Sequence, residues 1–559
     1  MNASEQHPSK FKAAIKELLP AYIITFTFCY MLFVYEPILM YSTNQLDFWF
    51  DLALMAGPML IGFAMFFFGS AVIMTAVFLI NKTIVKGKDP IVYWVMTILL
   101  FLVFFVTYIQ GNFLAGDLPA LDGSVINWNG LEKNDIFTFV IEILVSVVII
   151  FLIVNLNVKR TFHITAIAAG AIFVIITISL LVTVISWNAF ARKDGVITTS
   201  KDFDTISSDK NFLILLNDAI GSTEFWSVLE ENPEYKEVFE DFTYFPDTLG
   251  CYPCTRDTIP LVLSGGLNKN EMEFEDFSSQ SLNKSPFFRE LTEKGYDIDL
   301  YEAELIWYGA KEFNVNNSAD YGNYRLPFRS FFREEMKYIG YKYLPYRLKR
   351  YSNIESMDFN GLVEKYIWDD RTIYSLVKNK PNMVKTSDRI FKLVHTEGAH
   401  IPFKYDKDLN ILDDYGTYEQ KIEATITMLK AYLERLKANE AYDNTVIIVM
   451  ADHGNTDLNS SDDMLVRANP MFMIKGINER HEFEVSEKPL SYLDLMDIYS
   501  RLLDDKTARE ATSDIPDKRE RIFMWYRNFR LEHHIKEYVV TDKAWEWRKF
   551  RLTGNEYVL

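Results

Sequence analysis

Residues 250–266 read GCYPCTRDTIPLVLSGG and concentrate several side chains that could act as nucleophiles. Four of them carry a thiol or a hydroxyl group close to a short apolar run: Cys251, Cys254, Thr255 and Thr258. Such a group attacks a phosphorus, sulfur or carbonyl centre well only after losing its proton, which requires a base or a metal ion nearby. Each of the four implies a different enzyme, so the choice depends on the elements that position this stretch.

A second set of polar residues follows apolar runs that are typical of buried strands. These runs occupy residues 211–216, 391–394 and 445–450. The polar residues that come after them are Asp218, His395, His400, Asp452 and His453. Ligands bind beyond the carboxyl ends of parallel strands, and mixed carboxylate and imidazole groups suit zinc or manganese. Singly, each residue has a simpler explanation as a cap or a turn, but together they favour a metal site.

The same region alternates strand and helix patterns. Apolar residues recur every three or four positions from Ile422 to Leu436, which predicts an amphipathic helix before the last of the three runs. We therefore assign residues 209–559 to an α/β domain with a largely parallel central sheet. Its aromatic and arginine-rich segment 521–551 is expected to finish the sheet and pack a helix against it, with a membrane-surface contact as the alternative.

The first third of the chain has a different composition. Mean hydropathy is −0.02 overall, yet five apolar runs are long enough to cross a bilayer, at residues 18–40, 52–80, 91–112, 136–156 and 164–187. We assign residues 1–191 to a transmembrane domain of five spans and residues 192–208 to a linker. The chain is thus expected to be an integral membrane protein.

Loop charges predict the orientation of these spans. Basic residues gather before the first span and in alternate loops, at residues 10–16, 82–88 and 159–160. The positive-inside rule then places the N-terminus in the cytoplasm and the α/β domain outside the plasma membrane. The net charge of −18 argues against a nucleic-acid partner, and three cysteines are too few for a disulfide-built scaffold.

The order FLILLND, CTRDTIPLVLSG, HTEGAHIPF and VIIVMADHG resembles the sulfatase and alkaline phosphatase-like superfamily. Five preceding spans resemble its membrane-bound transferase branch. That branch includes lipoteichoic acid synthase, cell-wall polysaccharide glycerol phosphate transferases and lipid A phosphoethanolamine transferases. The resemblance implies one divalent ion, Mn²⁺ or Zn²⁺, held by Asp218, Thr255, Asp452 and His453.

Within this resemblance, spacing selects Thr255 as the nucleophile. Sulfatases carry Cys or Ser ten residues before a glycine, and counting back ten from Gly265 reaches Thr255, whereas neither Cys251 nor Cys254 has a glycine at that distance. Formylglycine is made from Cys or Ser, so a threonine argues against sulfate ester hydrolysis. The structural alternative makes Thr255 a helix N-cap.

The resemblance also suggests roles for neighbouring residues. His400, in a His-Ile-Pro segment, is expected to contact phosphate or act as an acid or base. Arg256 pairs with phosphate or points to solvent, and His395 is a packed or supporting group near the substrate. Cys251 and Cys254 are expected to form a disulfide that braces the loop, with a redox pair and free thiols as alternatives.

Three departures bear on the branch. The segment NTDLNSSDDMLVRANPMFMIKG after DHG lacks the histidines of phosphoethanolamine transferases, which favours the glycerol phosphate branch. Glu302 and Glu304 stand near the position where the synthase has a histidine. Asp218 stands where the transferases usually have glutamate.

These features predict a metal-dependent phosphoglycerol transferase. It would move the group from a membrane phospholipid, phosphatidylglycerol, through a phospho-threonine to a cell-surface glycan or glycolipid. The alternatives are a membrane-tethered phosphodiesterase or sulfatase-like hydrolase, a phosphoethanolamine transferase, and a non-enzymatic sensor that retains the fold.

Overall fold

The structure is a computed structural model that describes residues 6–558 with gaps. The gaps are residues 46, 47, 49, 85–88, 115–117, 119–131, 156, 192–194, 270–273, 303–306, 309–313, 321–324, 353, 355, 356, 364, 365, 456–463 and 527–533. The chain divides into two compact units, one comprising residues 1–193 with 322–363 and the other residues 194–321 with 364–559.

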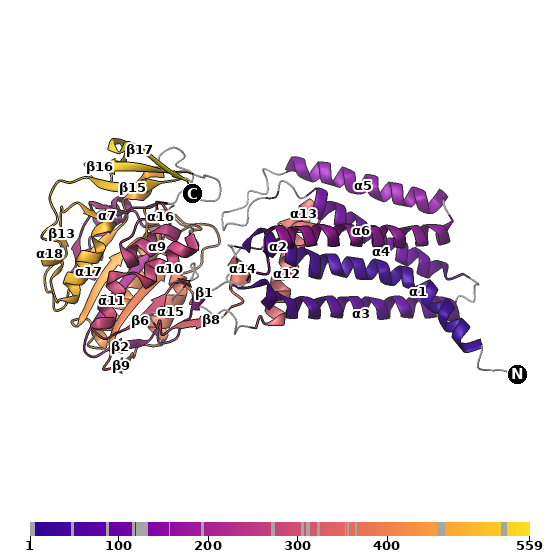
Figure 1. Cartoon of the computed structure of the whole chain (residues 1–559), viewed down its shortest axis with the longest axis horizontal. Helices are drawn as coiled ribbons and strands as arrows, with labels where there is room; N and C mark the ends of the chain where they lie inside the picture. The colour runs from indigo at the N-terminus through magenta and orange to yellow at the C-terminus, as the bar shows by residue number, and fades with distance from the viewer. Residues whose placement is uncertain are drawn as a thin grey trace. The chain divides into compact units, whose positions relative to one another are not determined.

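The first unit is built on long apolar helices (Figure 1). They are α1 (Gln6–Tyr30), continued by a π-helical turn (Met31–Tyr35) and α2 (Glu36–Thr43), then α3 (Leu52–Ile84), α4 (Ile91–Phe113), α5 (Glu132–Asn155) and α6 (Val158–Ser186). Among the described residues, four helices are long and apolar enough to cross a membrane, and α5 adds the shorter apolar stretch Ile136–Val148. Large apolar side chains are exposed along their outer faces, which is stable only in lipid. The chain is therefore an integral membrane protein.

Residues 322–363, which we expected within the α/β domain, belong to this membrane unit. They form α12 (Phe328–Tyr343), α13 (Tyr346–Lys349) and α14 (Met357–Asn360). The cause is packing: Ile339 and Tyr343 of α12 are buried in the same apolar cluster as side chains of α1, α4 and α6.

Glu335 of α12 gives this unit a testable pH dependence. Its side chain is 2% exposed, neither carboxylate oxygen has a hydrogen-bond partner among the described residues, and burial raises its pKa to about 9. Since the folded state holds the proton that the unfolded chain releases near pH 4.5, stability should fall between about pH 4.5 and 9, by up to about 1.4 kcal/mol per pH unit. Thermal unfolding in detergent should show a Tm decline from pH 5 to 8 that is smaller in Glu335→Gln; equal declines would contradict this.

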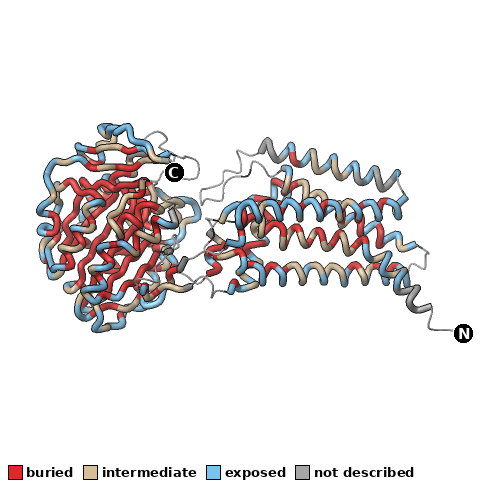
Figure 2. The backbone as a smooth tube through the Cα atoms, viewed as in Figure 1, coloured by how far each residue is buried: buried red, intermediate tan, exposed pale blue. Residues whose placement is uncertain are grey.

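The second unit contains a seven-stranded sheet, whose strands are drawn as largely buried in Figure 2. Its order is β13 (Glu484–Val485), β4 (Thr243–Tyr244), β12 (Phe472–Lys475), β11 (Thr445–Met450), β3 (Asn211–Asn217), β10 (Arg389–Thr396) and β6 (Tyr296–Tyr301). The pairs β11–β3, β3–β10, β10–β6 and β13–β4 are parallel, whereas β12 runs antiparallel to β11 and β4. This confirms an α/β domain with a largely parallel sheet.

Helices cover the sheet because its central strands are apolar on both faces. Every residue of β3 is buried, and Phe212, Ile214 and Leu216 pack in one cluster with side chains of α9 (Thr255–Ser264), α11 (Pro286–Glu293) and α17 (Leu495–Leu503). The predicted amphipathic helix is α16 (Tyr418–Ala438), which packs against α15 (Asp370–Asn379) and α7 (Ser222–Glu231). The remaining helices are α8 (Tyr235–Val238), α10 (Phe274–Asn283), α18 (Ala508–Ala511) and the 3₁₀ turns Met464–Ala468, Tyr492–Asp494 and Trp547–Lys549.

Small sheets complete the unit and correct two expectations. Part of the expected linker 192–208 is structured, because β1 (Gly195–Thr198) and β2 (Thr205–Ser207) pair with distant strands. Those partners are β7 (Trp307–Tyr308), β8 (Ser318–Asp320) and β9 (Val384–Thr386), and β5 (Thr248–Leu249) pairs with β14 (Leu490–Ser491). The C-terminal segment does not finish the main sheet. It forms a separate antiparallel sheet of β15 (Arg521–Trp525), β16 (His534–Val540) and β17 (Arg551–Val558), with its own apolar contacts.

Candidate active site

Strand register brings the predicted metal ligands to one edge of the sheet. Met450 of β11 is level with Leu216 of β3, so Asp218 and Asp452 each come two residues after paired positions. On the other side of β3, Thr396 of β10 is level with Asn217. The carboxyl ends of three adjacent parallel strands therefore meet where the polar residues lie.

Asp218, Asp452 and His453 form a compact group. One ligand atom from each lies within 4.8 Å of the others, and all three side chains are buried. His453 Nε2 is 3.6 Å from Asp218 Oδ1 and 3.3 Å from Asp452 Oδ2. Neither carboxylate oxygen of Asp218 has a hydrogen-bond partner among the described residues, which is costly for a buried acid. Two carboxylates and one imidazole with this unmet bonding capacity fit a divalent cation.

The charges of Asp218, Asp452 and His453 also favour a bound cation. Burial, followed by the neighbouring Asp452 carboxylate, raises the pKa of Asp218 to about 6. Burial would also raise the pKa of Asp452, but His453, His395 and the hydrogen bond from Thr255 hold it below its usual value. Two acids confined together without solvent are stabilised by a positive charge between them.

Thr255 is positioned by the start of α9. It is the first residue of the helix and directly follows the N-cap residue, Cys254. Its exposed fraction is 7%. Its Oγ1 donates a hydrogen bond of 2.6 Å to Asp452 Oδ2. The alternative role as a helix N-cap is thus wrong, because the hydroxyl is directed at the metal group and not at the helix backbone. The helix N-terminus favours negative charge developing at this oxygen.

The other three candidate nucleophiles face away from Asp452. Thr258 Oγ1 donates to the Cys254 carbonyl oxygen at 2.9 Å, and Cys251 Sγ lies 3.6 Å from Ser491 Oγ. Cys254 Sγ lies 2.6 Å from the Tyr526 hydroxyl. The expected disulfide is absent: both thiols are free because they point to different partners. Burial raises the pKa of each thiol to about 12, so neither is a ready thiolate.

The expected substrate-binding residues occupy three different environments. His395 is fully buried, with Nε2 3.8 Å from Asp218 Oδ2. His400 is half-buried in the loop after β10, and its Nδ1 lies 2.6 Å from the Ile401 carbonyl oxygen. Arg256 is half-buried on the first turn of α9. The structure thus places His395 beside the metal group, His400 after the neighbouring strand and Arg256 beside Thr255 in the chain.

Comparisons with known proteins agree with this architecture. The family model described as Sulfatase matches residues 210–497, which is more than half of the chain. The chain belongs to the sulfatase family. It is a membrane-anchored enzyme of the sulfatase superfamily, in which the fold is typically dependent on a divalent metal. No curated protein matches the sequence.

Solved structures resemble this chain only distantly. Ps i-CgsB in complex with k-i-k-neocarrahexaose is 13% identical, with a TM-score of 0.40, over 60% of this chain and 82% of that one. An alkaline phosphatase superfamily protein from Vibrio parahaemolyticus is 14% identical, with a TM-score of 0.34, over 65% and 84%. The C-terminal periplasmic domain of EcEptC from Escherichia coli is 10% identical, with a TM-score of 0.32, over 57% and 91%.

Sulfatase-family motifs did not predict three residues near the metal group. Glu302 directly follows β6 and is 1% exposed. Its Oε1 lies 3.2 Å from His395 Nδ1. The Trp368 ring lies 5.3 Å from the His395 ring and 5.9 Å from the His400 ring. Burial lowers the pKa of Arg467, while charges that include Asp218 and Asp452 act in the opposite direction. Glu304 lies outside the described residues.

Glu302 should matter for cation binding because it fixes His395. Carboxylates that hold a histidine beside a metal site typically contribute 10–100-fold to metal affinity or activity. We therefore expect Glu302→Gln to weaken Mn²⁺ or Zn²⁺ binding about tenfold or more in isothermal titration calorimetry. Asp299→Asn removes a buried carboxylate of β6, three residues before Glu302, and is the matched control. Equal affinities for the wild type and Glu302→Gln would contradict this role.

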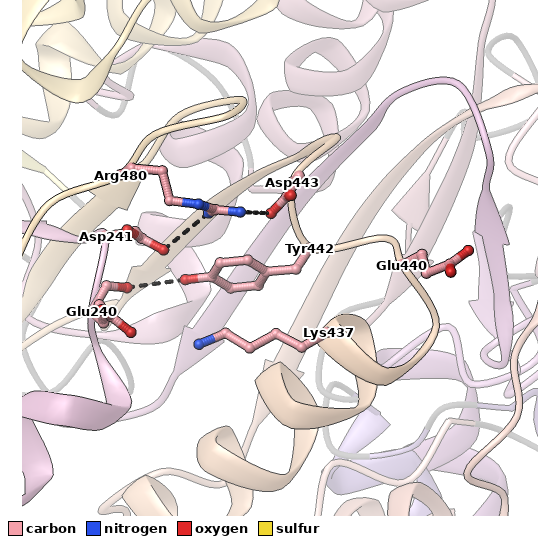
Figure 3. A pocket seen from close by; sticks show the side chains of 7 residues that line it. All are labelled: Glu240, Asp241, Lys437, Glu440, Tyr442, Asp443 and Arg480. Atoms are coloured by element: carbon pink, nitrogen blue, oxygen red, sulfur yellow. Dashed lines mark hydrogen bonds and ion pairs between the residues drawn. The ribbon is translucent and has the colours of Figure 1, made fainter.

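Figure 3 shows the residues that line a hollow of about 440 Å³. Tyr442 and Asp443 line it and precede β11, whereas Asp452 follows the other end of that strand. Arg480 forms ion pairs with Asp443 and, at 3.2 Å, with Asp241, and the Tyr442 hydroxyl donates to the Glu240 carbonyl oxygen at 3.0 Å. These groups satisfy one another, so the hollow does not compete with the metal group as an active site.

Proposed function

We propose that this protein is a phosphoglycerol transferase of the plasma membrane, with its catalytic unit outside the cell. The proposed donor is a membrane phospholipid, phosphatidylglycerol, and the proposed acceptor is a hydroxyl group of a cell-surface glycan or glycolipid. The observation that carries the proposal is the 2.6 Å hydrogen bond from Thr255 to Asp452 within the Asp218, Asp452 and His453 group. The chain thus combines an alcohol group that could act as a nucleophile, a group of residues that could hold a cation, and a membrane anchor.

Residues Asp218, Asp452, His453 and the Thr255 oxygen would hold one Mn²⁺ or Zn²⁺. When bound, such an ion lowers the pKa of a coordinated hydroxyl group and polarises a phosphoryl oxygen. The chain's own groups prepare the nucleophile: the Thr255 proton is already directed at the Asp452 carboxylate, and the start of α9 favours the developing charge on Oγ1.

In the first step, the Thr255 hydroxyl would give its proton to the Asp452 carboxylate while Thr255 Oγ1 forms a bond to phosphorus and the bond from phosphorus to the diacylglycerol oxygen breaks. His400 supplies the proton that the leaving diacylglycerol needs; its Nδ1 is occupied by the Ile401 carbonyl oxygen, which leaves Nε2 for this task. In the second step, an acceptor oxygen would form a bond to phosphorus and give its proton to His400, while the bond from phosphorus to Thr255 Oγ1 breaks and Asp452 returns the proton to Thr255. Arg256 and Arg467 would pair with the phosphoryl oxygens.

Transfer of a phospho-alcohol explains this nucleophile better than sulfate ester hydrolysis. A threonine cannot become formylglycine, and the thiols of the buried Cys251 and the half-buried Cys254 have other partners. The absence of histidines from the sequence segment after Asp452-His453-Gly454 favours glycerol phosphate over phosphoethanolamine as the transferred group.

The test uses the purified full-length protein in vesicles that contain phosphatidylglycerol labelled in its head-group glycerol. We expect formation of diacylglycerol, with label moving to an added glycan acceptor. Release of free glycerol phosphate at the same rate without acceptor would instead identify a phosphodiesterase. Turnover of phosphatidylethanolamine in its place would identify a phosphoethanolamine transferase.

A further inference from the structure

Helix α12 lies between two parts of the catalytic unit in the chain, yet it packs in the membrane unit. Chain connections between the two units therefore occur three times, at residues 193–194, 321–322 and 363–364. The second and third connections flank the segment that contains α12. They link the catalytic unit to the membrane helices only while α12 stays packed against those helices. The contacts that keep it there are thus of interest for the reaction.

The central contact is Glu36 at the start of α2. Its side chain is fully buried, and it accepts hydrogen bonds from three side chains of α12: Lys342, Tyr343 at 2.6 Å and Tyr338 at 3.2 Å. A π-helical turn, Met31–Tyr35, directly precedes Glu36; such turns are frequent at functional sites. An ionised carboxylate among apolar helices is costly unless it is paired, so Glu36 strongly favours the docked position of α12.

A second contact holds the same part of α12. A Cβ atom on Gly111 of α4 would lie 2.1 and 2.2 Å from two ring carbons of Tyr343, so only glycine admits the ring in this position. Tyr343 is thus seated between Glu36 of α2 and Gly111 of α4. Two residues far apart in the sequence act on one side chain.

Lys342 completes the polar contact, and among the described residues its ion pair is with Glu36. Its ammonium group pairs with Glu36, whereas Glu334, about two turns earlier, pairs with Arg333 and Lys337. The Glu36 contact is therefore specific to the C-terminal end of α12, where the helix also enters the apolar cluster of the membrane helices.

We propose that Glu36 is a positioning residue for the transfer reaction. By holding Lys342 and Tyr343, it keeps α12 on the membrane helices and preserves two of the three connections between the units. These connections raise the effective concentration of the active site toward a substrate embedded in the same bilayer. They leave the chemical steps at the active site unchanged. The inference rests on the proposed function, because it requires a membrane-embedded donor.

The test compares two substrates on the full-length protein in vesicles. One is phosphatidylglycerol in the bilayer; the other is bis(p-nitrophenyl) phosphate, a water-soluble phosphodiester. Glu36→Gln and, independently, Gly111→Ala should raise KM for the phospholipid about tenfold or more, while kcat/KM for the soluble diester changes less than about twofold. Gly69→Ala in α3, where an added Cβ meets nothing within 4 Å, is the matched control and should leave both values unchanged.

Hydrogen–deuterium exchange supplies the structural readout. Amides of residues 328–343 should exchange faster in Glu36→Gln and Gly111→Ala than in the wild type and Gly69→Ala. If exchange rises but the ratio of the two activities stays at the wild-type value, the positioning role is wrong; an equal fall on both substrates also overturns it. If the wild type cleaves the soluble diester but not phosphatidylglycerol, the proposed donor fails instead.

Discussion

We expect Thr255→Ala to lower the rate of the proposed transfer about 10⁴-fold or more, because the variant lacks the proposed nucleophile. The cation group retains Asp218, Asp452 and His453, so the variant still binds metal. The measurement is the initial rate of diacylglycerol formation from phosphatidylglycerol, with metal content determined on the same sample.

Two variants separate the nucleophile from its surroundings. Thr255→Ser keeps a hydroxyl group and should retain measurable turnover. Thr258→Val is the matched control: its hydroxyl bonds the Cys254 carbonyl oxygen within the same helix, and its loss should leave turnover within about tenfold of the wild type. Turnover by Thr255→Ala at the wild-type rate would exclude this residue as the nucleophile.

We expect Asp452→Asn to weaken divalent cation binding by more than about 100-fold, which is the upper end of what the loss of a supporting partner costs. Asp452 contributes a carboxylate to the group and also accepts the Thr255 hydrogen bond, so activity falls with affinity. Calorimetric titration with Mn²⁺ and Zn²⁺ measures the affinity directly.

Thermal unfolding provides an independent measurement of the same loss. A ligand that binds only the folded state raises Tm, so added cation should stabilise the wild type and a chelator should reverse the shift. Asp452→Asn should lose most of this response, whereas Asp247→Asn, a buried ion-paired carboxylate outside the group, should keep it. A cation response of wild-type size in Asp452→Asn would contradict the assignment.

The sequence was sufficient to predict the edge of the sheet where the site lies. Asp218 and Asp452 directly follow apolar strands, and parallel strands bring such residues together whatever the loops between them do. Spacing from Gly265 also selected Thr255 over the cysteines, and the Thr255 hydroxyl does lie at Asp452, but its role as the nucleophile stays a prediction. These predictions rest on short sequence patterns, and such patterns place residues in the same way wherever the fold occurs.

Long-range contacts were not predictable in the same way. Glu302 was identified from the sequence only as standing near a histidine position of the synthase, and its contact with His395 follows from the pairing of β6 with β10. The disulfide prediction failed because closeness in sequence says nothing about the directions of the Cys251 and Cys254 side chains. Helix α12 has an ordinary amphipathic pattern. Its membrane partners become evident only from the structure, in which its residues Ile339 and Tyr343 pack against the membrane helices.

Peptide mass spectrometry of the wild-type protein, quenched in acid after exposure to phosphatidylglycerol without acceptor, tests the central claim most directly. We predict a glycerophosphate adduct on Thr255, absent from Thr255→Ala and discharged when acceptor is added before quenching. An adduct on another residue, or turnover of the lipid with none on Thr255 at any time, would contradict the account.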